Sequence, residues 1–265
     1  MKPLIRWGLR MRRASTIWWS IGVSAFVTLE ISFFPAFKNQ AQQLNQTIGQ
    51  LPTAVKSLIG DSGNYFSPEN YLNSRVFYLV IPILFAILMI GLGCSLLARE
   101  EQDGTLELLL SRPVSRGRLL AGKALTGIYI SGTIALVSLI VCVGLCKAVG
   151  LPNSLAEMGA AMLESYLLCL VFGAFAFMLT SLGKATRGLS LGLTTCLFVG
   201  SYVLTGLVSA VDWLKWPARL LPYYYFNPEK MLTGQYAWGP VIGYFLAVVV
   251  FAWVGWLGFR RRDIG

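Results

Sequence analysis

Six long apolar runs constrain the fold of this chain more than any other feature of its sequence. The hydrocarbon core of a bilayer is roughly 30 Å thick, and a helix needs about 20 apolar residues to cross it. Inside a bilayer the backbone groups must pair within their own segment, so each run is predicted to be a helix. We therefore expect an all-α polytopic membrane protein that forms a single transmembrane domain over residues 1–265. Its six spans are expected at about 17–37, 76–97, 124–146, 159–182, 189–211 and 239–259.

The composition agrees with this architecture and argues against several kinds of chemistry. Hydrophobic residues make up 55% of the chain, charged residues make up 13%, and the mean hydropathy is +0.63. The sequence has no histidine, so neither a Ser-His-Asp triad nor a histidine metal site is expected. Its five cysteines lie inside the apolar runs and form no C-x-x-C pair, which favours packing over metal or disulfide roles. We expect no catalytic residue and no metal site.

Basic residues are distributed unevenly between the two sides of the predicted bundle. With both termini inside, the inner segments hold 15 of the 22 Lys and Arg residues, and the outer segments hold seven. Such an excess marks the cytoplasmic side of membrane proteins. We therefore expect a multi-pass protein of the inner (plasma) membrane with both termini cytoplasmic. The net charge of +10 then reflects topology and not nucleic-acid binding. The run at 17–37 is too long for a signal peptide and is expected to remain as the first span.

Two predicted outer segments carry structure of their own. In residues 38–75, apolar side chains recur at alternating steps of four and three, which predicts an amphipathic helix interrupted near Pro52. Ser67 and Pro68 resemble an N-cap and a first helical position, so the second helix is expected to begin in this segment. Residues 212–238 are rich in aromatic residues and proline, which predicts short interfacial helices before the sixth span.

One long charged loop, residues 98–123, separates the second and third spans. Its leucines fall on one helical face, and its acidic residues lie near the opposite face. A helix resting on an anionic inner leaflet would carry basic residues instead. We predict a short cytoplasmic helix at about 99–112 that docks on a cytosolic protein, is ended by Pro113 and is followed by Ser115 as the cap of the next helix.

The sequence of this loop resembles the signature of type-2 ABC transporter permeases. The matching residues read Glu100-Glu101-x-x-Gly104-Thr105-Leu106-Glu107-x-Leu109-Leu110-Ser111-x-Pro113-Val114-Ser115-Arg116, followed by Lys123. The loop follows the second of six spans, as it does in that family, and the layout of the remaining chain agrees. The resemblance implies that the helix at 99–112 is a coupling helix, which inserts into a cleft on a separate ATPase subunit.

The same resemblance implies the permease subunit of an ABC exporter, which performs no covalent chemistry itself. It implies cytosolic ABC ATPase subunits as partners, with ATP and Mg bound there and no cofactor on this chain. It also implies a dimer with a second copy of this chain or with a similar permease. The residues expected to contact the ATPase are Glu100, Glu101, Gly104, Thr105, Glu107, Ser111, Arg112 and Arg116.

A second motif in the loop is similar to a nucleotide-binding P-loop. Gly117-x-x-x-x-Gly122-Lys123 matches a P-loop up to its last position, where Ala124 replaces the Ser or Thr that binds magnesium. A P-loop must also follow a buried strand, whereas this stretch leads into a span. We therefore expect no nucleotide site here.

Glu30 and Glu164 are acidic residues expected within or near the spans. Charges in hydrocarbon are costly, so each is a candidate for lining a substrate path. An interhelical hydrogen bond or ion pair is one alternative for both residues, and an interfacial position is another.

Two other functions stay open at the level of sequence. An energy-independent carrier or channel would need an ionisable network near the membrane midplane, and only Glu30 comes near to that. A membrane-embedded enzyme would need clustered nucleophiles, acid-base groups or metal ligands, which the absence of histidine disfavours. Nothing in the sequence indicates the transported substrate.

Overall fold

The computed structural model describes residues 2–52, 55–56, 58, 68–102, 115–151, 154–183, 186–209 and 211–261. Within these residues, every regular element is helical, and six stretches are long and apolar enough to cross a membrane. They are Arg13–Ala36, Leu72–Leu97, Arg116–Val149, Leu155–Ser181, Arg187–Leu207 and Trp238–Arg261. The expectation of an all-α protein with six apolar helices is confirmed. The third stretch is longer than predicted, because it begins at Arg116 and not near residue 124.

The elements follow one another with few breaks. The chain starts with α1 (Lys2–Met11), α2 (Arg13–Ser32) and α3 (Phe34–Gly49). The second span is a helical path formed by α5 (Pro68–Tyr71), η1 (Leu72–Val80) and α6 (Ile81–Gln102). The next three spans are α8 (Arg116–Val149), α9 (Leu155–Ser181) and α10 (Arg187–Leu207). Four short helices precede α13 (Trp238–Arg261), as the sequence predicted: η2 (Asp212–Leu214), α11 (Lys215–Ala218), η3 (Pro222–Tyr225) and α12 (Pro228–Leu232).

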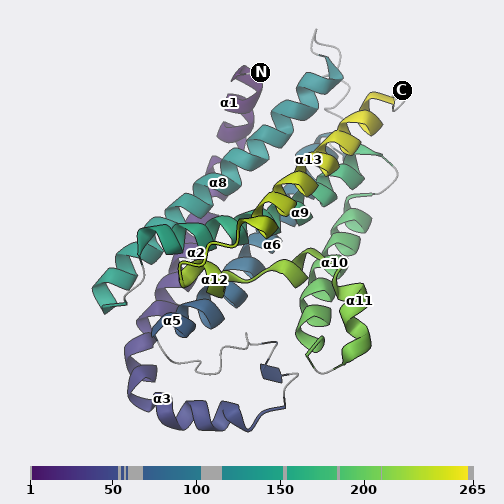
Figure 1. The fold of residues 1–265 in the computed structure, drawn as a ribbon. Coiled ribbons are helices and arrows are strands. Elements are labelled where there is room, and N and C mark those ends of the chain that lie inside the picture. The colour runs from purple at the N-terminus through teal and green to yellow at the C-terminus, as the bar shows by residue number, and fades with distance from the viewer. Residues whose placement is uncertain are drawn as a thin grey trace.

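Figure 1 shows α1, the start of α8 and the end of α13 at one end of the bundle. We call this the basic end, because Arg6, Arg10, Arg116, Arg260 and Arg261 lie in these parts of the helices. The opposite end, which holds α3 and the end of α8, is the far end. The two ends of the chain therefore approach the same side of the bundle.

Local sequence signals explain where several long helices begin and end. Ser154 and Glu157 form a capping box at the start of α9, in which each side chain accepts the backbone N–H of the other. Thr186 caps α10 in the same position. Gly150 ends α8 with a φ of 75°, a left-handed conformation that glycine adopts without strain. Ser115 occupies the predicted cap position of α8, but its side chain makes no capping hydrogen bond.

Pro82 determines the course of the second span. In an α-helix, a proline donates no N–H, and its ring collides with the carbonyl four residues earlier, which here is that of Tyr78. The segment just before Pro82, η1, is a π-helix, whose wider turn relieves that collision. The carbonyl of Pro82 accepts the thiol of Cys169 on α9, with 3.3 Å between sulfur and oxygen. The Tyr78 carbonyl thus loses its α-helical donor and becomes available to another part of the chain.

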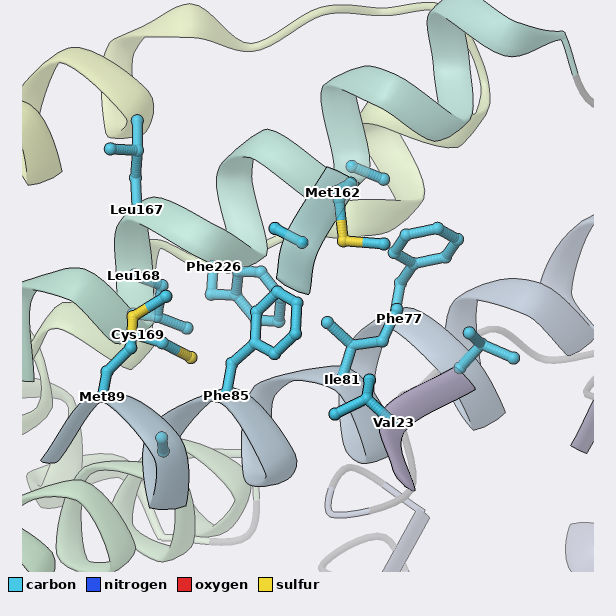
Figure 2. Packing of buried hydrophobic residues seen from close by; sticks show 14 of the residues in the cluster. Val23, Phe77, Ile81, Phe85, Met89, Met162, Leu167, Leu168, Cys169 and Phe226 are labelled. Atoms are coloured by element: carbon cyan, nitrogen blue, oxygen red, sulfur yellow. The ribbon is translucent and has the colours of Figure 1, made fainter. Parts of the chain in front are cut away.

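The second span and α9 form the centre of the bundle. In each of them 61% of the most apolar stretch is buried, compared with 22% or less in α2, α10 and α13. α9 packs most extensively against α6 and α13, while α2 packs against α8. Apolar side chains spaced four apart along one face of η1 and α6 point toward α9 (Figure 2): Phe77, Ile81, Phe85 and Met89. Met162, Leu168 and Cys169 meet them from α9.

Two glycines bring the backbones of α6 and α9 into contact. A Cβ atom on Gly93 would collide with the carbonyl oxygen of Gly173. A Cβ atom on Gly173 would lie 2.9 Å from the carbonyl oxygen of Met89. Small residues serve this purpose in membrane helices, where van der Waals packing replaces the hydrophobic effect as the driving force.

We expect Gly93→Ala to lower the free energy of unfolding by about 1–3 kcal/mol, because the added methyl group forces the two backbones apart. Gly91→Ala is the matched control, since a Cβ there meets nothing within 4 Å. Titration of the purified protein with a denaturing detergent measures both values. Equal stabilities for the two variants would contradict the close approach.

Candidate functional site

Most residues predicted to dock on an ATPase lie outside the described residues. α6 ends at Gln102 and α8 begins at Arg116, so the segment 103–114 joins these two helix ends. The backbone of Glu100 and Glu101 continues α6, and Arg116 opens α8. The other five predicted docking residues belong to the segment itself: Gly104, Thr105, Glu107, Ser111 and Arg112. The predicted coupling helix at about 99–112 therefore stays a prediction.

A second, smaller apolar cluster holds the helix ends that flank segment 103–114. It joins α6, α8, α9 and α13 at the basic end through Leu96, Leu97, Leu119, Leu120, Phe177 and Phe259. Leu4 of α1 packs against this cluster. The two helices between which the segment is attached are therefore packed together and not splayed.

α1 contacts both helices that flank the segment. The guanidinium of Arg12, between α1 and α2, donates to the Ser95 hydroxyl of α6 at 3.0 Å and to the Ser95 carbonyl at 3.1 Å. Gly8 lies so near α8 that a Cβ atom there would be 2.9 Å from a side-chain carbon of Thr126. The ammonium of Lys123 lies 5.2 Å from the centre of the Trp7 ring. A movement of either helix end would therefore disturb these contacts with Trp7, Gly8 and Arg12.

The stretch that imitates a P-loop has a different geometry. Residues 116–123 are the first turns of α8, so their backbone forms helical hydrogen bonds instead of a phosphate-binding loop. Gly117 faces the Trp256 indole, whose nitrogen would be 2.7 Å from an added Cβ. Lys123 is buried, with 9% of its surface exposed. Gly117 therefore allows α8 to pack closely against Trp256 of α13.

Part of the aromatic stretch before the sixth span lies inside the bundle. Trp213 and Trp216 are exposed, as expected for rings at the headgroup level. In contrast, Tyr223 and Phe226 are buried among the spans. We call residues 221–232, which contain η3 and α12, the inserted segment. Non-helical backbone at this depth is tolerated only where the protein itself supplies hydrogen-bond partners.

Tyr223 ties the inserted segment to two helices. Its backbone N–H donates to the Ser201 hydroxyl of α10 at 3.2 Å. Its own hydroxyl donates to the Tyr78 carbonyl of η1 at 2.7 Å, which is the carbonyl that Pro82 deprives of an α-helical partner. Burial raises the pKa of Tyr223 well above its ordinary value, so the hydroxyl keeps the proton that it donates. Its ring lies 5.3 Å from that of Tyr202 and 5.2 Å from that of Phe226.

Two further side chains complete the hydrogen bonds of the inserted segment. The Tyr244 hydroxyl of α13 donates to the Pro222 carbonyl at 3.1 Å. A carboxylate oxygen of Glu164, on α9, accepts the backbone N–H of Asn227 at 3.3 Å. Together with Ser201 and Tyr78, these contacts join the segment to α9, α10, α13 and η1. The sequence did not predict this arrangement, although Pro82 inside an apolar run indicates a carbonyl that loses its α-helical donor.

The structure separates the two predicted path residues. Glu164 is buried, with 1% of its surface exposed, and one of its carboxylate oxygens accepts the backbone N–H of Asn227 in the inserted segment. Among the described residues, its second carboxylate oxygen has no hydrogen-bond partner. Glu30 is partly buried on α2, and its backbone carbonyl accepts the Tyr71 hydroxyl at 2.7 Å. α2 packs mainly on α8, and α9 packs mainly on α6 and α13, so the two carboxylates belong to different interfaces.

Among the described residues, no three His, Cys, Asp or Glu side chains lie close enough together to hold a metal ion. All five cysteines carry free thiols.

Two comparisons with known proteins concern the chain as a whole. The family model described as ABC-2 family transporter protein matches residues 4–263. The matched range includes all six apolar helices, the segment 103–114 and the inserted segment. A search of curated proteins finds no match.

We expect Tyr223→Phe to lower the free energy of unfolding by about 1 kcal/mol, because the buried Tyr78 carbonyl loses its donor. Tyr225→Phe is the matched control: its hydroxyl donates to the Arg219 carbonyl, but the side chain is exposed, and we expect a change within about 0.5 kcal/mol. Unfolding in a denaturing detergent measures both. A loss as small in Tyr223→Phe as in Tyr225→Phe would contradict the role of this bond.

Proposed function

We propose that this chain, which belongs to the ABC-2 family of transporter proteins, is the transmembrane permease subunit of an ABC exporter. The family makes it a membrane component of an ABC transporter, and the six apolar helices are those of a multi-pass membrane protein. The observation that carries the finer proposal is the acidic motif at residues 100–116, which lies between α6 and α8 within a family match to nearly the whole chain. In this proposal both termini are cytoplasmic, and the basic end faces the cytoplasm.

In the proposed mechanism, the segment between α6 and α8 forms a coupling helix that docks on a cytosolic ABC ATPase. ATP and Mg bind to that partner, and closure of its subunits moves the coupling helix. Rigid-body movement of a packed element is a common way to transmit such a change. The packing of Leu96 and Leu97 on Leu119 and Leu120 supports this mechanism, because the flanking helix ends would move together.

A second permease is part of the proposal. α2 and α10 each have only 22% of their most apolar stretch buried, so most of their surface is available to lipid or to another protein. We propose that this chain pairs with a second copy of itself or with a similar permease, and that the substrate path lies between the two. Glu30 and Glu164 are the proposed acidic residues of that path. An energy-independent carrier or channel, and a membrane-embedded enzyme, are the alternatives that family membership disfavours.

We expect the double variant Gly104→Trp with Glu107→Lys to abolish co-purification with the ATPase, because it adds bulk and reverses a charge on the proposed docking face. We expect membrane insertion to be retained, since neither residue belongs to one of the six apolar helices that the structure describes. Affinity purification from solubilised membranes, with the partner ATPase quantified, measures the loss.

Asp212→Lys is the control for this experiment, because it reverses a charge on an exposed residue of the aromatic stretch before the sixth span. We expect that variant to retain the ATPase. Unchanged co-purification of the double variant would overturn the docking proposal, whatever the transported substrate is.

We expect Glu30→Gln to lower ATP hydrolysis by the purified complex in native membrane lipids, with dimer assembly unchanged. The reason is that a carboxylate within a span is costly and is kept where a charged or polar path needs it. Asp212→Asn removes an acid from an exposed site and should leave hydrolysis at the wild-type level. Wild-type hydrolysis in Glu30→Gln would limit this residue to a structural role.

A further inference from the structure

An open cavity of about 460 Å³ lies between the inserted segment and α13. Leu221 and Pro222 form one wall, and Gly239, Gly243 and Ala247 form the other. Val171 of α9 also lines it. Binding sites for small ligands commonly measure about 300–1,000 Å³, so the volume suits a single chain-like molecule.

The wall on α13 leaves open space beside it because its residues are small. Gly239, Gly243 and Ala247 are spaced four apart and therefore share one face of the helix. Cβ atoms on Gly239 and Gly243 would meet nothing within 4 Å. These glycines differ from Gly93 and Gly173, whose missing side chains are replaced by a neighbouring backbone. The groove along α13 is thus left unfilled by the described residues.

The hydroxyl groups of the two tyrosines that line the cavity form hydrogen bonds within the protein. The Tyr244 hydroxyl donates to the Pro222 carbonyl, and the Tyr225 hydroxyl donates to the Arg219 carbonyl. Most of the surface that faces the groove is apolar. Ile242 and Leu246, the neighbours of Gly243 and Ala247 on α13, are exposed apolar residues of a helix that is long enough to span the membrane. We expect a groove beside the apolar surface of a helix able to span the membrane to open toward hydrocarbon.

One end of the groove carries the features of a headgroup layer. Trp238 directly precedes Gly239 and is exposed, as is Trp216 of α11. Amphipathic aromatic rings gather at the level of lipid headgroups. Arg219 is exposed next to the lining residue Leu220, and its guanidinium has no partner among the described residues. Arg219 thus supplies a cation next in sequence to the lining residue Leu220, and its backbone carbonyl is bonded to the lining residue Tyr225.

We propose that this groove binds one acyl chain of an anionic phospholipid whose phosphate pairs with Arg219. The lining from Gly239 to Ala247 extends about 12 Å at 1.5 Å per residue. That length approaches the depth of one leaflet, which is half of the roughly 30 Å hydrocarbon core. The proposal concerns lipid binding by the folded chain, so it does not depend on the ATPase partner or on the direction of transport.

Photo-crosslinking of the full-length protein in detergent micelles tests this site. The probe is phosphatidylglycerol with a photoreactive diazirine in one acyl chain, and mass spectrometry locates the labelled peptides. We expect label on residues 239–247. Gly243→Leu fills the groove and should reduce this label roughly tenfold or more. Gly239→Leu fills the other end of the same wall and serves as a second filling variant if Gly243→Leu does not fold.

Matched controls separate the chain from the headgroup. Gly144→Leu adds the same side chain to an open, exposed position of α8 and should leave the label on 239–247 unchanged. Arg219→Gln should reduce labelling by the phosphatidylglycerol probe about fivefold, and it should not affect a diacylglycerol probe with the same chain, which has no phosphate.

Three results would overturn the proposal. The first is equal labelling of 239–247 in wild type and in both filling variants, which would indicate unspecific lipid contact. The second is equal labelling by the two lipids in wild type, which would remove the role of Arg219. The third is absence of lipid label from 239–247 in wild type, which would show that no acyl chain occupies the groove.

Discussion

One physical constraint governs the far end of this bundle: a peptide group buried in hydrocarbon must be hydrogen-bonded. An unpaired group costs several kcal/mol there, and a helix avoids the cost by pairing internally. The inserted segment is not one continuous helix, so other elements must pair its backbone. Ser201, Glu164 and Tyr244 each provide a hydrogen bond from a different span, and Tyr223 itself satisfies a carbonyl of the second span. Ser201, Tyr244 and one carboxylate oxygen of Glu164 therefore have a role in holding the inserted segment.

The basic end is organised by packing more than by buried hydrogen bonds. Leucines of α6 and α8 meet next to the segment that the proposed ATPase would contact, and α1 lies against both helices. Close backbone contact between α6 and α9 at Gly93 and Gly173 connects this end to the core. A movement imposed between α6 and α8 would therefore reach the central helix pair through directly packed atoms. The basic end is thus held mainly by side-chain packing, whereas the far end is held by hydrogen bonds between segments.

Much of the fold could be predicted from the sequence, because length and hydropathy alone identify a helix that can cross a bilayer. The six spans follow from such local signals. The burial of Tyr223 could not be predicted, since prolines and aromatic residues occur equally in an interfacial belt and in a segment held inside a bundle. The partner of Glu164 was also beyond reach, because it is a backbone N–H located 63 residues later. The acidic segment was identified by its sequence motif alone, and this motif does not specify the conformation of the segment.

The bond between Tyr78 and Tyr223 has a consequence for biosynthesis. The two residues are 145 positions apart, so the ribosome must make more than half of the chain between them. Until Tyr223 has been made, the Tyr78 carbonyl, which Pro82 deprives of its α-helical donor, lacks this hydrogen bond. The contact can therefore form only after the fifth span has followed the second. The final arrangement of the second span thus waits for residues that are synthesised much later.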